Sequence, residues 1–149
     1  MFIAVSSLTN FCIIRQFFHI ILITAIFFLS ACDTINSHYP TAGDARKSEE
    51  FKRQRLPKIL PDSAFDITES YNFDLNISNG SFRFAARDSE SFRAHLTWDP
   101  LSTAQGLDEE LAKLQRNGYI FYTFEKFSIA VNWKTYHAVF WHIFPVEYS

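Results

Sequence analysis

The apolar residues change their spacing along the chain, and each spacing predicts a different kind of segment. Residues 17–28 form an almost unbroken apolar run, whereas residues 33–56 are rich in polar and charged side chains. From residue 65 onward, apolar residues alternate with polar ones or recur every three to four positions, as in strands and amphipathic helices. The pattern therefore predicts an apolar leader over 1–31, a polar tether over 32–56 and one globular domain over 57–149.

Two alternating segments at the start of the domain predict a β-hairpin. Residues 65–74 place apolar side chains on one side of a strand, interrupted only by Glu69. Residues 81–87 alternate in the same way, with three residues directed inward: Phe82, Phe84 and Ala86. Asn79-Gly80 is a common hairpin turn sequence, so we expect it to connect the two strands.

Two helices and two further strands follow the hairpin. Residues 89–96 carry Phe92 and Leu96 one helical turn apart, and residues 107–117 begin with acidic and end with basic side chains. Residues 119–125 and 135–144 are rich in aromatic residues and predict strands. The order β-β-α-α-β-β predicts an α+β fold, with one antiparallel sheet of about four strands and the helices on one face.

The last predicted strand is apolar on both of its faces. Ala138 and Phe140 alternate with Val139 and Trp141, so both sides of this strand need a cover. One face meets the helices, and the other is covered by other parts of this chain, by a partner or by the membrane surface. In the second case an aromatic patch forms an interaction surface. Its candidate partner-binding residues are Trp133, Tyr136 and Trp141.

A short motif closes the apolar run at the start of the chain. Arg15 precedes the run, and Leu29-Ser30-Ala31-Cys32 follows it. This arrangement resembles bacterial lipoprotein precursors, in which the lipobox cysteine receives a diacylglycerol and cleavage occurs before it. The resemblance implies a lipid on Cys32, anchoring in the cell membrane and loss of residues 1–31.

A retained membrane anchor is the alternative. The fifteen residues from Phe17 to Ala31 span roughly 22 Å as a helix, which is short of the ~30 Å hydrocarbon core of a bilayer. A longer span that begins at Phe11 places Arg15 and His19 inside the membrane, where a charge is costly. Length therefore favours the lipoprotein interpretation.

Asp33 directly follows the cysteine of the motif. An aspartate at this place resembles the signal that retains enterobacterial lipoproteins in the inner membrane. The resemblance implies a domain that faces the periplasm from that membrane. The alternative is that Asp33 is an ordinary tether residue with no role in sorting.

Charge and cysteine content exclude several classes of function. Residues 33–58 carry six basic and four acidic side chains, whereas residues 59–149 carry seven basic and twelve acidic ones. An acidic domain argues against nucleic-acid binding. The basic cluster within 52–58 lies close to the predicted anchor and either contacts anionic lipid or forms a solvated helix face. Cys12 leaves with the leader, so no disulfide is expected.

No catalytic, metal or cofactor motif stands out. His137 and His142 are five residues apart on one predicted strand, which directs them to opposite faces and excludes a shared metal. His95 lies near several carboxylates, among them Asp88 and Asp99, but no serine or cysteine occurs in a nucleophile motif. Residues 60–67 resemble the opening of some small uncharacterised bacterial proteins, and no function follows from that likeness.

The sequence therefore predicts a lipid-anchored protein of the bacterial envelope that is not an enzyme and that binds a protein partner. Two alternatives stay open. One is a small envelope hydrolase that uses His95 with a neighbouring carboxylate. The other is an immunity-type lipoprotein that blocks a toxin at the membrane.

Overall fold

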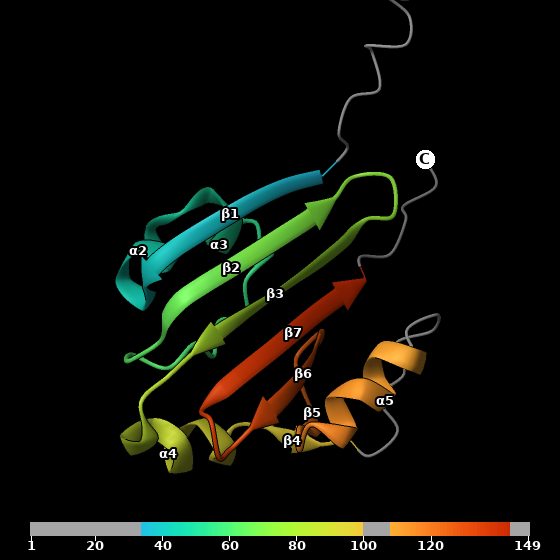
Figure 1. The fold of residues 1–149 in the computed structure, drawn as a ribbon. Coiled ribbons are helices and arrows are strands. Elements are labelled where there is room, and N and C mark those ends of the chain that lie inside the picture. Colours follow the sequence, from blue (N-terminus) through green and yellow to red (C-terminus); the bar gives the residue numbers. More distant parts are fainter. Residues whose placement is uncertain (1–33, 100–107, 144–149) are drawn as a thin grey trace, which may run out of the picture. The chain divides into compact units, whose positions relative to one another are not determined.

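The computed structural model describes residues 34–99 and 108–143, which belong to one compact unit, Asp33–Ser149. Within these residues, seven strands form one antiparallel sheet in the order β1-β2-β3-β7-β6-β5-β4 (Figure 1). The α+β class is confirmed, and the sheet is larger than the predicted four strands. The strands are β1 (Thr34–Thr41), β2 (Phe65–Asn72), β3 (Ile77–Arg83), β4 (Thr97–Trp98), β5 (Ile120–Phe124), β6 (Phe127–Asn132) and β7 (His137–Ile143).

Short helices connect the strands. They are α2 (Ala42–Lys47), α3 (Glu49–Lys52), α4 (Ser89–Ala94) and α5 (Asp108–Arg116), together with the 3₁₀ turn η1 (Ala86–Asp88). The two helices predicted from the sequence correspond to α4 and α5. Gly118 follows α5 with a φ of +81°, and its N–H donates to the carbonyl of Gln115, as expected for a glycine that ends a helix. Among the described residues, no helix is long and apolar enough to cross a membrane.

The described part of the predicted tether is folded, so that prediction is wrong for these residues. β1 pairs with β2 along its length, from Thr34 opposite Asn72 to Thr41 opposite Phe65. Helices α2 and α3 then begin at side-chain caps, because Thr41 Oγ1 and Ser48 Oγ accept backbone N–H groups. The segment is polar because β1 is an edge strand with a solvated face, and α2 buries only alanines. Cys32 and Asp33 lie outside the described residues.

The predicted hairpin is confirmed as β2–β3, but its turn lies elsewhere. The loop spans residues 73–76, where Asn72 Oδ1 accepts the N–H of Leu75 and Asn76 has a φ of +51°. Gly80 instead lies inside β3, opposite Glu69. A Cβ atom on Gly80 would lie 2.0 Å from the carbonyl oxygen of Thr68 and 2.6 Å from the Phe140 ring. The glycine therefore permits close packing within the sheet and makes no turn.

Strand β6 was not predicted, although Phe127, Ile129 and Val131 alternate with Ser128, Ala130 and Asn132 as in a strand. Ile129 and Val131 face the main core, whereas Ala130 belongs to a second cluster on the other face. A two-residue turn with Glu125 at a φ of +51° connects β5 to β6. In the following loop, Asn132 Oδ1 accepts backbone N–H groups of Lys134 and Thr135, as Asn72 does in the first hairpin.

The main core occupies one face of the sheet. Buried side chains of β2, β3, β6 and β7 pack there against α2, α4 and the segment that connects α3 to β2. Aromatic rings fill much of this layer, and Phe84 and Phe92 are in edge contact with ring centroids 5.2 Å apart. The inward orientation predicted for Phe82 and Phe84 is confirmed, whereas Ala86 is exposed.

The other face is covered over only part of its width. Leu111 and Leu114 of α5 pack against a cluster that contains Ala130 and Trp141, so α5 lies on the opposite side of the sheet from α4. The prediction that all helices share one face is therefore wrong. Figure 1 shows α5 over the end of the sheet formed by β5 and β6, with α2 and α3 at the end formed by β1 and β2. No described helix covers β1, β2 and β3 on the side of α5.

Candidate functional site

The uncovered surface of β1, β2 and β3 is almost wholly polar, and we call it the open face. Strand pairing sets its side chains in rows, with Asn36, Ser70 and Asn79 in one row and His38, Thr68 and Ser81 in the next. A hollow of about 390 Å³ lies over both rows. The open face also includes Asp66 and Arg83, and β7 continues it with His137, which lies opposite Arg83.

A bulge in β2 directs one carboxylate onto the open face. The register between β2 and β3 shifts between Phe65 and Thr68, and Asp66 within this shift has a φ of +51°. Aspartate adopts this left-handed conformation at a cost, and bulges of this kind redirect side chains near functional sites. The result is a carboxylate held between two cationic or potentially cationic groups.

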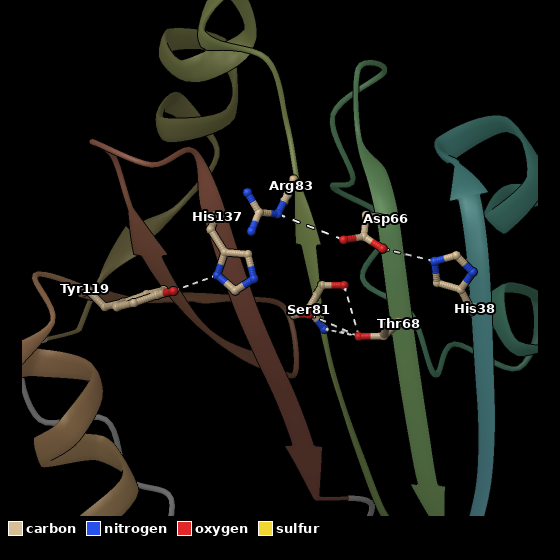
Figure 2. Close-up of polar contacts among 7 residues, drawn as sticks. All are labelled: His38, Asp66, Thr68, Ser81, Arg83, Tyr119 and His137. Atoms are coloured by element: carbon tan, nitrogen blue, oxygen red, sulfur yellow. Dashed lines mark hydrogen bonds and ion pairs between the residues drawn. The ribbon is translucent and has the colours of Figure 1, made fainter.

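That carboxylate joins three strands. His38 Nε2 lies 3.0 Å from Asp66 Oδ1, and Arg83 Nε lies 3.9 Å from Asp66 Oδ2 (Figure 2). Both pairs are more than half exposed, so each contributes little to stability. An exposed row that adds little to folding is available for recognition of a ligand.

Two hydroxyl groups lie beside this row, two residues away along β2 and β3. Thr68 Oγ1 is 3.0 Å from Ser81 Oγ, and it also accepts the backbone N–H of Ser81 at 3.2 Å (Figure 2). Among the described residues, no hydrogen bond joins either hydroxyl to a histidine. Neither hydroxyl therefore has the histidine partner of a Ser–His nucleophile in this structure.

Tyr119 and His137 form the border with α5. The Tyr119 hydroxyl lies 2.6 Å from His137 Nδ1. Burial, helped by the nearby Arg83 guanidinium, lowers the pKa of His137 below its usual value, and burial raises the pKa of Tyr119. Both groups are therefore neutral near pH 7. Two neutral arrangements fit this contact: the tyrosine O–H donates to Nδ1 when the ring proton of His137 is on Nε2, and it accepts when the proton is on Nδ1.

The predicted aromatic candidates do not form one surface. Trp141 is 6% exposed and lies beneath α5, where Phe121 contacts its ring. Trp133 and Tyr136 are half-buried against the main core on the other face, where both contact Phe84. Both faces of β7 are thus covered by the chain itself, which was the alternative to a partner-binding patch.

The histidines of the sequence analysis are also placed. His137 and His142 lie on opposite faces of β7, as predicted, with His142 Nδ1 2.7 Å from the carbonyl of Lys126. His95 ends α4, and its Nδ1 is 2.7 Å from the carbonyl of Ser91. It lines a groove of about 390 Å³ together with Asp88 and Ser91. Within the described residues, no group of three or more potential ligands is positioned to hold a metal ion.

The residues of the open face were missed for two reasons. His38 lies in a segment interpreted as tether, so it was not considered as part of the domain. Asp66, Ser81 and Arg83 occupy the outward positions of predicted strands, where polar residues are the norm. The alignment of these residues across β1, β2 and β3 would have revealed the row. That alignment can be derived only when the turn of the β2–β3 hairpin is assigned correctly.

Comparison with known proteins gives one match. The model of the YbbD head domain, a bacterial family, matches residues 33–83, which include β1, β2 and β3. The match covers 51 of the 149 residues. No curated protein and no solved structure matches the chain.

Proposed function

We propose that this chain is a lipid-anchored protein of the bacterial envelope whose domain binds a protein partner through the open face. The observation that carries the proposal is the polar row of His38, Asp66 and Arg83 on a sheet surface that no described helix covers. Large uncovered sheet faces with aligned polar side chains suit recognition, because a rigid sheet holds the side chains in place. In this proposal the domain is a binding module and has no catalytic activity.

The anchor is the second part of the proposal. A lipid on Cys32 holds the domain in the membrane, and Asp33 retains it in the inner membrane, where it faces the periplasm. The match of residues 33–83 to a bacterial family supports a bacterial origin, which this kind of lipid anchor requires. β1 begins at Thr34, so the domain starts directly after the proposed lipid.

The anchor is tested by the intact mass of the membrane-extracted protein, with and without inhibition of lipoprotein signal peptidase. We expect a species that begins at Cys32 and carries two or three acyl chains. A chain that keeps residues 1–31 without lipid indicates a signal anchor and removes the roles of Cys32 and Asp33.

The binding surface is tested by photo-crosslinking in cells. A photoreactive amino acid replaces Asn79 on the open face or, as control, Glu90 on α4, and both positions are exposed. We expect one envelope protein to be crosslinked from position 79 and not from position 90. Equal adducts from both positions contradict a binding role for the open face. A toxin among the adducts identifies the chain as an immunity-type protein.

The groove beside His95 keeps a hydrolase as the second candidate. A histidine, a carboxylate and a hydroxyl line this groove, as hydrolysis requires. Asp88 is however engaged by the backbone N–H and hydroxyl of Ser63, and the Ser91 hydroxyl donates to the carbonyl of Asp88. Hydrolysis of p-nitrophenyl esters that is lost in His95→Gln favours this candidate, and equal background rates for both proteins exclude esterase activity of this kind.

A further inference from the structure

We propose that Arg83, His137 and Ser81 form a subsite for a carboxylate group of the bound partner. This inference rests on the proposed function of the open face. The carboxylate belongs to an acidic side chain or to the C-terminus of the partner polypeptide. We call these three residues the Arg83 subsite.

Arg83 supplies the positive charge. Its side chain is 55% exposed, and among the described residues its only charged partner is Asp66, with Nε 3.9 Å from the carboxylate. The two terminal nitrogens of the guanidinium are drawn on the side of His137 and away from Asp66 (Figure 2). These N–H groups form the planar fork that pairs with a carboxylate through two parallel hydrogen bonds.

His137 supplies a second donor next to that fork. It lies directly opposite Arg83 in the pairing of β3 with β7, so the two side chains are neighbours on one face. In the proposed subsite the Tyr119 hydroxyl donates to Nδ1, and the ring proton of His137 then lies on Nε2. Figure 2 shows this second ring nitrogen on the side of Ser81. Tyr119 is therefore a positioning residue, because it selects the tautomer that donates into the subsite.

Ser81 completes the subsite with a hydroxyl. Its Oγ is 3.0 Å from Thr68 Oγ1, and either oxygen can donate in this pair. When Thr68 donates, the hydroxyl proton of Ser81 is available to a ligand. The subsite then offers a guanidinium, an imidazole N–H and a hydroxyl, which are the groups that bind carboxylates in proteins.

The charge of the surroundings favours a carboxylate over a phosphate. Asp66 offsets much of the positive charge of Arg83, and His137 is neutral for the reasons given above. A dianionic phosphate therefore meets a single partly neutralised cation and a nearby carboxylate. A monoanionic carboxylate fits this balance better, and the neutral side chains of the hollow contact the rest of the ligand.

The test is an NMR titration of the purified full-length chain in detergent micelles with sodium acetate, sodium phosphate or sodium chloride at matched ionic strength. The readouts are the backbone amide shifts of Ser81 and Val139 and the ring nitrogen shifts of His137. We expect saturable shifts with acetate that phosphate reproduces only weakly and chloride does not reproduce. The Arg83→Gln variant is expected to bind acetate at least tenfold more weakly.

A matched control isolates the subsite from general charge effects. Arg87 is an exposed arginine whose Nε also lies 3.9 Å from a carboxylate, that of Asp88. Arg87→Gln removes the same charge elsewhere and should leave acetate binding unchanged. Thermal unfolding of both variants checks that each one is folded.

Three other outcomes would contradict the proposal. An absence of saturable acetate shifts removes the subsite, whereas crosslinking from position 79 would then still support the open face as a binding surface. Stronger shifts with phosphate assign the site to a phosphate group, such as a lipid headgroup. Equal losses in Arg83→Gln and Arg87→Gln show that acetate responds only to net charge.

The role of Tyr119 has a separate readout. In Tyr119→Phe, His137 loses its hydrogen-bond donor at Nδ1, and the ring nitrogen shifts should report a mixture of tautomers. We expect acetate affinity to fall several-fold while the thermal transition is little changed. An unchanged tautomer in Tyr119→Phe contradicts the positioning role.

Discussion

A single buried carboxylate stands out at the scale of residues. Glu69 is 1% exposed on the core side of β2, where Ser78 Oγ donates to its Oε1 at 3.3 Å. Its Oε2 has no hydrogen-bond partner within the described chain. The nearby Arg55 places its guanidinium 3.7 Å from the centre of the Tyr71 ring. Burial is the main cause that raises the pKa of Glu69 from 4.5 to about 7.

This raised pKa makes stability depend on pH. Because the folded protein holds the proton more tightly than the unfolded chain, folding is favoured at low pH, and that contribution is lost as pH rises from about 4.5 to about 7. The loss amounts to roughly 3 kcal/mol, since one pKa unit corresponds to about 1.4 kcal/mol.

Replacement of Glu69 by glutamine removes the titrating proton and keeps the shape of the side chain. We expect Glu69→Gln to match the wild type in urea unfolding at pH 4.5 and to exceed it by roughly 2–3 kcal/mol at pH 8. The exposed Glu49, which is paired with Lys52, is the control position, and Glu49→Gln should show no such gain. A wild-type stability that does not fall between these pH values contradicts the assignment to Glu69.

At the scale of elements, contact between β2, β3 and β7 depends on the absence of a side chain at Gly80. A Cβ at this position overlaps the backbone of β2 and the Phe140 ring of β7. We therefore expect Gly80→Ala to destabilise the domain by about 3 kcal/mol or more, through displacement of backbone and core. Chemical denaturation measures the loss.

Gly43 offers the matched control for this substitution. It lies in helix α2, and a Cβ there has only the Thr41 hydroxyl nearby, at 3.7 Å. Gly43→Ala should stabilise the domain by about 0.5–1 kcal/mol, because alanine is the better helix former. If Gly80→Ala lowers the free energy of unfolding by less than about 1 kcal/mol, the backbone of β2 and the Phe140 ring of β7 can move away from the new methyl group at little cost.

The elements also show what the sequence can predict. Period-two and helical patterns identified β2, β3, α4 and α5, because each of these buries one side and exposes the other, whereas β5 and β7 were identified by their aromatic content. β1 is polar and lacks the pattern of a half-buried strand, whereas β6 carries that pattern in Phe127, Ile129 and Val131 and could have been predicted. The Asn79-Gly80 sequence has two physical explanations, a turn or a close approach of strands, and local sequence does not distinguish them.

The candidate site could not be predicted from local sequence patterns either. The row of His38, Asp66 and Arg83 depends on the pairing of β1 with β2 and on a bulge, both of which are tertiary features. Trp141 was predicted to bind a partner because an aromatic residue on a second apolar face needs a cover. The chain supplies that cover through α5.

At the scale of the whole molecule, the described residues cover both faces of the sheet in its C-terminal half and one face in its N-terminal half. The two clusters on opposite faces hold the C-terminal half together. In the proposed function, stability and recognition are therefore separated in space, since the open face contributes few buried groups.

Substitution of two tryptophans tests whether α5 buries this part of the sheet. Trp141→Ala should cost about 3–5 kcal/mol in the free energy of unfolding, because the ring is buried beneath α5. Trp98 on β4 is 65% exposed, and Trp98→Ala should change the stability by less than about 0.5 kcal/mol. Similar losses for the two variants contradict the cover formed by α5.

In the proposed function the anchored domain binds its partner through the open face. The most direct measurement is the native mass of the protein after mild detergent extraction, compared among the wild type, Ser70→Trp and Glu90→Trp. Ser70 lies in the hollow of the open face, and Glu90 lies on α4. We predict that the wild type and Glu90→Trp carry the additional mass of a partner and that Ser70→Trp does not. A partner that stays bound to Ser70→Trp, or that is lost only from Glu90→Trp, contradicts the account.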